Sequence, residues 1–118
     1  MIYSFCRSHD NYLRDFDYPE TREECREALR KRFGDDIIFL GYYQHTGCVW
    51  FVEGEGGPGT ECRWDGVQFA GVWVPSRAQR CKATKISKRS DTDRDEYLRL
   101  AAREDCEILT DRWNGEED

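Results

Sequence analysis

Residues 21–40 read TREECREALRKRFGDDIIFL, and they join a capped helix to a buried strand. Thr21 and Glu24, three residues apart, form a capping box that marks the start of the helix. Gly34 supplies a left-handed stop at its end. The apolar residues between these signals recur at helical spacing, namely Cys25, Ala28, Leu29 and Phe33. The continuous apolar run at residues 37–40 then predicts a strand that is covered on both faces.

Further strands are expected before and after this unit. Residues 48–52 form a second continuous apolar run, which a turn at residues 41–47 joins to the first. A glycine-rich loop at residues 54–59 follows, and Asp65-Gly66 is a strong tight-turn signal between the two strands of a hairpin. The expected strands are residues 2–6, 37–40, 48–52, 61–64 and 67–74.

The last third of the chain divides into a basic segment and an amphipathic helix. Residues 76–89 are polar and lack a clear period, so we expect a long loop with at most one edge strand. A helix should begin at residues 90–92 and carry its apolar stripe as far as Trp113. The sequence therefore predicts a single α+β domain over residues 1–118. Its expected order is β-α-β-β-β-β-α, with a mainly antiparallel four- to five-stranded sheet and two helices.

Length and composition place the chain among single globular domains. It has 118 residues, of which 38% are hydrophobic and 14% aromatic, enough for one core without an obligatory metal or disulfide. No window is long and apolar enough for a membrane span, and the apolar start at residues 1–6 is too short for a signal peptide. We therefore expect a cytoplasmic protein whose six cysteines are reduced.

Charge is distributed unevenly along the chain. The net charge is -6. Residues 1–59 hold 7 basic and 11 acidic side chains, residues 60–89 hold 7 and 2, and residues 90–118 hold 4 and 11. The ends are thus acidic around a basic segment, and such asymmetry informs on partners rather than on fold.

The acidic residues and the surplus of aromatic residues both suggest a protein partner. Carboxylates on a rigid helix can imitate a phosphate backbone, although most acidic helices are only solvated faces. The aromatic residues exceed what a small core can hold, and Tyr and Trp often anchor interfaces, including those of homodimers. The candidate partner-binding residues are Asp93, Asp95, Glu96, Glu104, Glu107, Asp111, Tyr42, Tyr43 and Trp64.

The basic segment supports a different hypothesis, direct binding of nucleic acid. Lys and Arg neutralise phosphates, and a neighbouring Trp73 offers a ring on which a base can stack. The simpler interpretation is a solvated loop that interacts with the acidic last helix, and the acidic net charge favours it. The candidate nucleic-acid residues are Arg77, Arg80, Lys82, Lys85, Lys88 and Arg89.

Both histidines lie three residues from a cysteine, which raises the question of zinc. The pairs Cys6/His9 and His45/Cys48 could together supply a tetrahedral two-cysteine, two-histidine site. The alternative, which we favour, is that Cys6 and Cys48 are strand residues that pack inward. No cofactor other than zinc is suggested by any pattern.

Catalysis finds no support in the sequence. The nucleophile elbow, the phosphate-binding loop and the metalloprotease helix motif are all missing from it. A cysteine and a histidine that are neighbours on a strand or turn seldom reach the geometry of a catalytic pair. We therefore expect a protein that is not an enzyme.

The first third of the chain resembles small phage and prophage accessory proteins. The resemblance is carried by residues 3–6, by residues 17–29 with their Thr-Arg-Glu-Glu helix start, and by residues 34–41. Such proteins include anti-CRISPR and other anti-defence inhibitors, which often act by binding. The resemblance implies an inhibitor that blocks a host defence or nucleic-acid-processing complex, and it assigns no roles to residues. The alternative is a zinc-stabilised nucleic-acid-binding module that uses residues 77–89.

Overall fold

A computed structural model describes residues 1–44, 47–55 and 66–115. The described chain forms a four-stranded antiparallel sheet and three helices, which confirms the α+β class. The order of the strands in the sheet is β1-β4-β2-β3. The elements are β1 (Ile2–Ser4), α1 (Arg22–Phe33), β2 (Ile38–Gln44), β3 (Cys48–Val52), β4 (Gly66–Trp73), α2 (Arg77–Ser87) and α3 (Asp91–Trp113).

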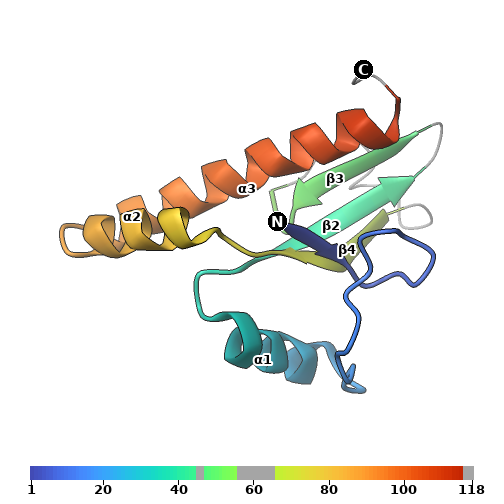
Figure 1. Ribbon diagram of the computed structural model, residues 1–118, viewed down its shortest axis with the longest axis horizontal. Helices are drawn as coiled ribbons and strands as arrows, with labels where there is room; N and C mark the ends of the chain where they lie inside the picture. The colour runs from blue at the N-terminus through green and yellow to red at the C-terminus, as the bar shows by residue number, and fades with distance from the viewer. Residues whose placement is uncertain (45–46, 56–65, 116–118) are drawn as a thin grey trace.

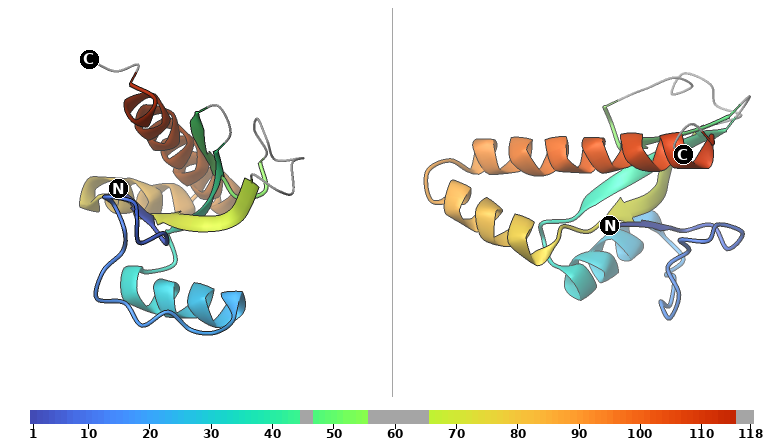
Figure 2. Two further views of the ribbon diagram at one scale, coloured as in Figure 1. Left: turned by 90° about the vertical axis from the view of Figure 1, so that its right-hand side faces the viewer. Right: turned by 45° about the horizontal axis from the view of Figure 1, so that its top comes forward.

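The sheet lies between two helical layers (Figures 1 and 2). Helix α1 covers one face, and the hairpin of α2 and α3 lies over the other and extends past the sheet (Figure 1). Because side chains alternate along a strand, neighbouring residues of β4 point to opposite faces of the sheet and pack in different layers. Val72 packs in the cluster under α1, whereas Trp73 packs in the cluster under α3, and both are fully buried.

Helix α1 forms as the sequence predicts. The Thr21 hydroxyl accepts a hydrogen bond from the backbone N–H of Glu24, and Gly34 follows the last turn with φ of 97°. Cys25 and Leu29, which are four residues apart, bury the same face of the helix against Phe39 and Val72. The capping signals and the apolar period thus specify this element locally.

Helix α2 occupies the segment where we expected a loop, so the helix count of two and the loop at residues 76–89 were wrong. Ser76 and Gln79 form a capping box that starts the helix. Ala83 is the one buried residue of α2, and it packs in the same cluster as Leu98 and Ala102 of α3. A helix that is held through a single small residue shows no stripe of large apolar side chains, which is why the period was missed.

Two strand boundaries also differ from the prediction. Strand β2 continues to Gln44, through the first half of the turn expected at residues 41–47, because Tyr42 and Tyr43 pair with both β3 and β4. A register shift between Leu40 and Tyr42 accommodates this continuation. Strand β1 ends at Ser4, so Cys6 lies beyond the strand and is exposed, and the expectation that it packs inward was wrong. The strand predicted at residues 61–64 and the turn residue Asp65 lie outside the described residues.

Side chains and loops cover both edges of the sheet. At β3, the backbone N–H groups of Cys48 and Trp50 donate to side chains of α3 and its C-cap. At β1, the N–H of Ser4 donates to the carbonyl of Asn11, and the carbonyl of Ser4 accepts from the N–H of Leu13. The edges therefore offer few free backbone groups for pairing with another chain. None of the helices in the described ranges combines the length and apolar character needed to cross a membrane.

Candidate partner-binding surface

Helix α3 has a buried side that fixes which of its residues face outward. Ser90 caps its N-terminus, with the serine hydroxyl accepting from the N–H of Asp93. Leu98, Ala102 and Cys106 recur every four residues and are almost completely buried against the sheet and α2. Residues about half a turn away from these three must therefore point to solvent.

The solvent side of α3 carries a row of carboxylates that we call the acidic stripe. Its members follow one another at helical spacing, with Leu100 in the middle of the row, and all are exposed: Asp93, Glu96, Glu104, Glu107 and Asp111. Within the part of the chain that the structure describes, no ion pair involves any of these five carboxylates. Five of the six acidic residues predicted to bind a partner thus lie together on one face.

The sixth predicted acidic residue, Asp95, lies away from the stripe. Its carboxylate pairs with Arg94 at 2.9 Å, and Arg94 also pairs with Asp36 in the segment before β2. This arrangement ties the first turns of α3 to the sheet layer. Asp95 therefore has a partner within the fold, which sequence spacing alone did not reveal.

A second ion-pair group borders the stripe. Glu55, which follows β3, accepts hydrogen bonds from Arg99 and Arg103 on one side of α3. Burial acts to raise the pKa of Glu55, but the hydrogen bonds from Arg103 and Arg99 outweigh it and lower the pKa below its usual value. One Glu55 carboxylate offsets only one of these two arginine charges, but both arginines form their ion pairs with Glu55 rather than with a carboxylate of the stripe.

An open groove of about 500 Å³ runs beside the C-terminal half of the stripe. It is lined partly by Met1, Ile108 and Trp113. Met1 and Ile108 are 69% and 43% exposed, and Leu100 within the stripe is 49% exposed. Ile108 lies four residues after Glu104 on the helix, so apolar and acidic side chains adjoin one another.

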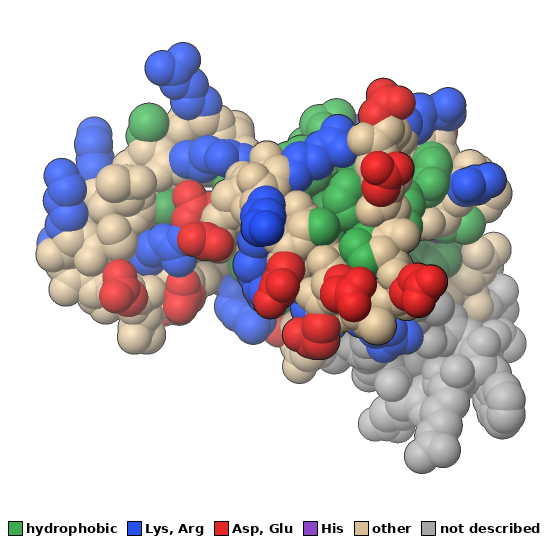
Figure 3. All heavy atoms as spheres, turned by 90° about the horizontal axis from the view of Figure 1, so that it is seen from below, with side chains coloured by type: hydrophobic (Ala, Val, Ile, Leu, Met, Phe, Trp, Pro, Cys, Tyr) green, Lys and Arg blue, Asp and Glu red, His purple; other side chains and the backbone are tan. Residues whose placement is uncertain are grey.

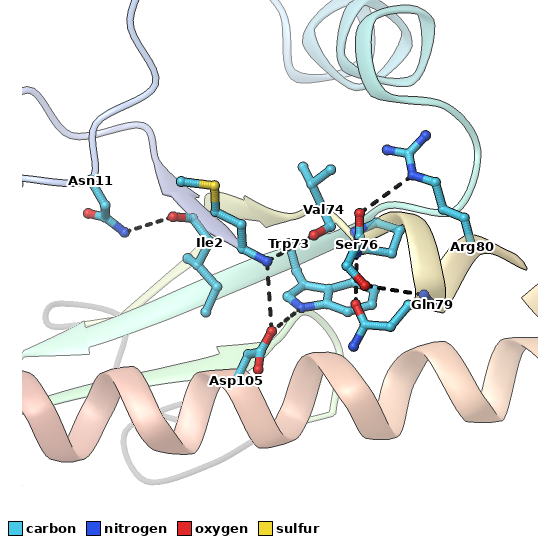
Figure 4. A network of polar contacts seen from close by, with 10 residues as sticks. Ile2, Asn11, Trp73, Val74, Ser76, Gln79, Arg80 and Asp105 are labelled. Carbon is cyan, nitrogen blue, oxygen red and sulfur yellow. Dashed lines mark hydrogen bonds and ion pairs between the residues drawn. The ribbon is translucent and has the colours of Figure 1, made fainter. Parts of the chain in front are cut away.

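The position of Met1 in the groove is fixed by the polar contacts drawn in Figure 4. The terminal ammonium group donates to the carbonyl of Val74 at 2.9 Å and lies 3.7 Å from Asp105. The same Asp105 oxygen accepts a hydrogen bond of 2.6 Å from the indole of the buried Trp73. Asp105 thus joins α3 to β4 and to the start of the chain.

Two of the aromatic residues predicted to bind a partner, Tyr42 and Tyr43, do not form part of this surface. Tyr42 is partly buried, packs against His9, Trp50 and Trp113, and donates its hydroxyl hydrogen to Gln44. Tyr43 is also partly buried in β2. Trp64 lies outside the described residues. The large apolar side chains exposed beside the stripe, Leu100 and Ile108, are aliphatic, so a pattern of aromatic anchors does not reveal them.

Three of the four predicted zinc ligands, Cys6, His9 and Cys48, lie around Tyr42. Burial raises the pKa of Tyr42, and the thiols of Cys48 and Cys6 raise it further, while the ring of His9 packs 5.2 Å from the tyrosine ring. One nitrogen of His9, Nδ1, lies 2.6 Å from the buried hydroxyl of Ser4. Among the described residues no three potential ligands form a metal-binding group, and His45 lies outside them.

The predicted nucleic-acid residues lie on α2 and in the turn after it. Arg77, Lys82, Lys85, Lys88 and Arg89 are exposed, whereas Arg80 is partly buried and its side chain donates to the carbonyl of Pro75. Figure 3 shows Lys and Arg side chains in blue, with Asp and Glu side chains in red among them, at the end of the molecule that contains α2. The structure therefore places four of these cations on one helix and the other two, Lys88 and Arg89, in the turn that follows it.

Comparison of the chain with protein-family models, with curated proteins and with solved structures gives no significant match.

Proposed function

We propose that this chain is a non-enzymatic binding protein that docks its acidic stripe on a basic surface of a partner protein. The observation that carries the proposal is that exposed carboxylates and exposed apolar side chains occupy the same side of α3. The carboxylates would steer the encounter and set specificity. Leu100, Ile108 and Met1 would supply the desolvated contacts that give most of the binding energy.

The stripe suits a partner surface that normally holds nucleic acid. Asp93 and Asp111 are eighteen residues apart, so the stripe extends over about 27 Å of helix, with an average axial spacing of about 7 Å between carboxylates. This row is sparser than the phosphates of one DNA strand, which recur about every 3.4 Å along the axis. The carboxylates alone would therefore imitate a phosphate backbone incompletely, and apolar contacts would have to supply further binding energy.

The resemblance to phage accessory proteins narrows the class of partner. On that basis we propose an inhibitor that blocks a defence or nucleic-acid-processing complex in the host cytoplasm. Binding would cover the partner's basic surface and exclude its nucleic acid, so no chemical step by this chain is required.

A pull-down from nuclease-treated host lysate tests the proposal when two charge-matched variants accompany the wild type. The stripe variant combines Glu96→Gln, Glu104→Gln and Glu107→Gln. The control combines Glu20→Gln, Glu24→Gln and Glu27→Gln, which neutralise three exposed carboxylates in and just before α1. We expect the wild type and the control to recover the same protein and the stripe variant to lose it. Failure of the wild type to recover any protein, or equal recovery by both variants, would refute the proposal.

A further inference from the structure

The outer face of α2 is a second charged surface, opposite in sign to the acidic stripe. Arg77, Lys85, Lys88 and Arg89 are exposed, and none of them forms an ion pair within residues 1–44, 47–55 and 66–115. Lys82 rests its ammonium group 5.0 Å from the ring centre of Tyr97 on α3. Across those ranges, four exposed cations of this face thus have no carboxylate partner.

The sequence around these cations keeps the face purely basic. Between Ser76 and Ser90 there are six Lys and Arg residues and no Asp or Glu. Elsewhere in the fold, Arg26 of α1 pairs with a carboxylate, and so do three arginines of α3, namely Arg94, Arg99 and Arg103. Among the three helices of the described chain, α2 is thus the one in which no cation forms an ion pair.

We propose that the outer face of α2 binds the phosphate backbone of nucleic acid. The five exposed cations of α2 and the turn after it, Arg77, Lys82, Lys85, Lys88 and Arg89, extend over twelve residue steps, or about 18 Å, with an average axial spacing of about 4.5 Å. Phosphates along one strand of duplex DNA recur about every 3.4 Å. The spacing of these cations is thus closer to that of the phosphates than the average spacing of the carboxylates in the acidic stripe is.

The side chains between the cations favour this ligand over a membrane or an acidic protein. Ala78, Cys81 and Thr84 are the exposed residues of α2 that carry no charge. A helix that lies on a membrane needs large apolar side chains on its inserted face. A protein interface draws most of its energy from buried aromatic or other large anchors. The exposed side of α2 offers neither, whereas phosphate contacts require only cations.

This binding is independent of the partner proposed for α3. The basic face belongs to α2 and the turn after it, and the stripe belongs to α3, so the residues of each can be substituted without changing those of the other. Net negative charge on the rest of the chain weakens attraction at low salt, but charges farther away than about 8 Å are largely screened at physiological ionic strength.

Fluorescence anisotropy of the purified full chain with a labelled 20-base-pair DNA duplex tests the inference. A single-stranded RNA of the same length is tested in parallel, and the comparison shows whether the chain binds DNA or RNA. The test variant combines Arg77→Gln, Lys85→Gln and Lys88→Gln, since Gln keeps helix propensity. The control combines Arg7→Gln, Arg22→Gln and Lys31→Gln, which remove three exposed cations elsewhere. Circular dichroism establishes that all the proteins fold alike.

We expect the wild type and the control to bind at least one of the two nucleic acids at 50 mM salt, and the α2 variant to bind at least tenfold more weakly. The slope of log affinity against log salt should fall by about 0.9 for each duplex DNA phosphate that the variant no longer neutralises, or by about 0.7 with a single strand. Binding of neither nucleic acid by the wild type, or equal weakening in both variants, would overturn the inference. Equally strong competition by polyglutamate would also overturn it, because an acidic protein would then be the better ligand.

Discussion

The side-chain amide of Asn114 forms two hydrogen bonds with the backbone of Cys48. Its oxygen accepts from the Cys48 N–H and its nitrogen donates to the Cys48 carbonyl, each at 2.9 Å. Asn114 is the residue that ends α3, and Cys48 begins the edge strand β3. A single amide thus fixes the C-terminal end of the helix that carries the acidic stripe and also covers the edge of the sheet.

Replacement of Asn114 by Ala should lower the free energy of unfolding by about 1–3 kcal/mol, because two backbone groups lose their partners. Urea unfolding followed by circular dichroism measures the change. Asp111→Ala, at an exposed position three residues earlier, is the control and should change stability by less than about 0.5 kcal/mol. Equal stability of Asn114→Ala and the control would show that the amide does not hold the strand.

Asp105 should matter for stability through the indole of Trp73. Asp105→Leu leaves the N–H of a fully buried tryptophan without its acceptor, at a cost of about 1–3 kcal/mol. Asp105→Asn keeps an oxygen at the same place and should lose less. Thermal unfolding of the two variants gives the comparison, and an Asn variant no more stable than the Leu variant would contradict the role given to this hydrogen bond.

The thiols should differ sharply in reactivity toward iodoacetamide. The hydroxyl of Ser8 lies 3.0 Å from the sulfur of the exposed Cys6 and lowers its pKa. Burial raises the pKa of Cys106 to about 12. Cys6 should therefore be alkylated in the native protein and Cys106 only after unfolding, as peptide mass spectrometry can show.

Ser8→Ala supplies the matched test of that cause. Loss of the hydroxyl should raise the pKa of Cys6. The alkylation rate of Cys6 increases with pH, and this increase should then occur at a higher pH. An unchanged pH profile would show that the serine does not stabilise the thiolate.

Glu55 should contribute to the acid sensitivity of the fold. Its pKa is lower in the folded chain than its ordinary value of 4.5. The stabilisation from its arginine partners is thus fully present above that ordinary value and is lost as the pH falls through the folded pKa. Between pH 6 and pH 3, Glu55→Gln should lose less stability than the wild type, by about 1 kcal/mol or less because the arginines are half exposed. Identical pH dependence of the two proteins in urea unfolding would contradict this.

Local signals explain which elements could be predicted from the sequence. Helix α1 carries its own cap, apolar period and glycine stop, so its prediction was right. Helix α2 also has a capping box, but tertiary contact through Ala83 stabilises it, and a small buried residue leaves no periodic pattern. The continuation of β2 through Tyr42 likewise depends on pairing with β3 and β4. The glycine and polar residues near Tyr42 are typical of a turn, so the sequence did not predict a strand there.

The residues of the candidate site also divide into those whose grouping the sequence predicts and those whose position only the fold reveals. The spacing of Glu96, Glu104 and Glu107 places them on one face of any helix, so their grouping follows from the sequence. The pairing of Asp95 with Arg94 and the burial of Tyr42 depend on which segments the fold brings together. The exposure of Leu100 and Ile108 could be found only from the packing of α3, because leucine and isoleucine are more often buried.

The most direct measurement for the proposed function is the dissociation constant of the recovered partner for the wild type, the stripe variant and the α1 control, by isothermal titration calorimetry. Both variants lose the same three negative charges, so only position distinguishes them. The account predicts at least tenfold weaker binding for the stripe variant and unchanged binding for the control. Equal affinities of the two variants would contradict it.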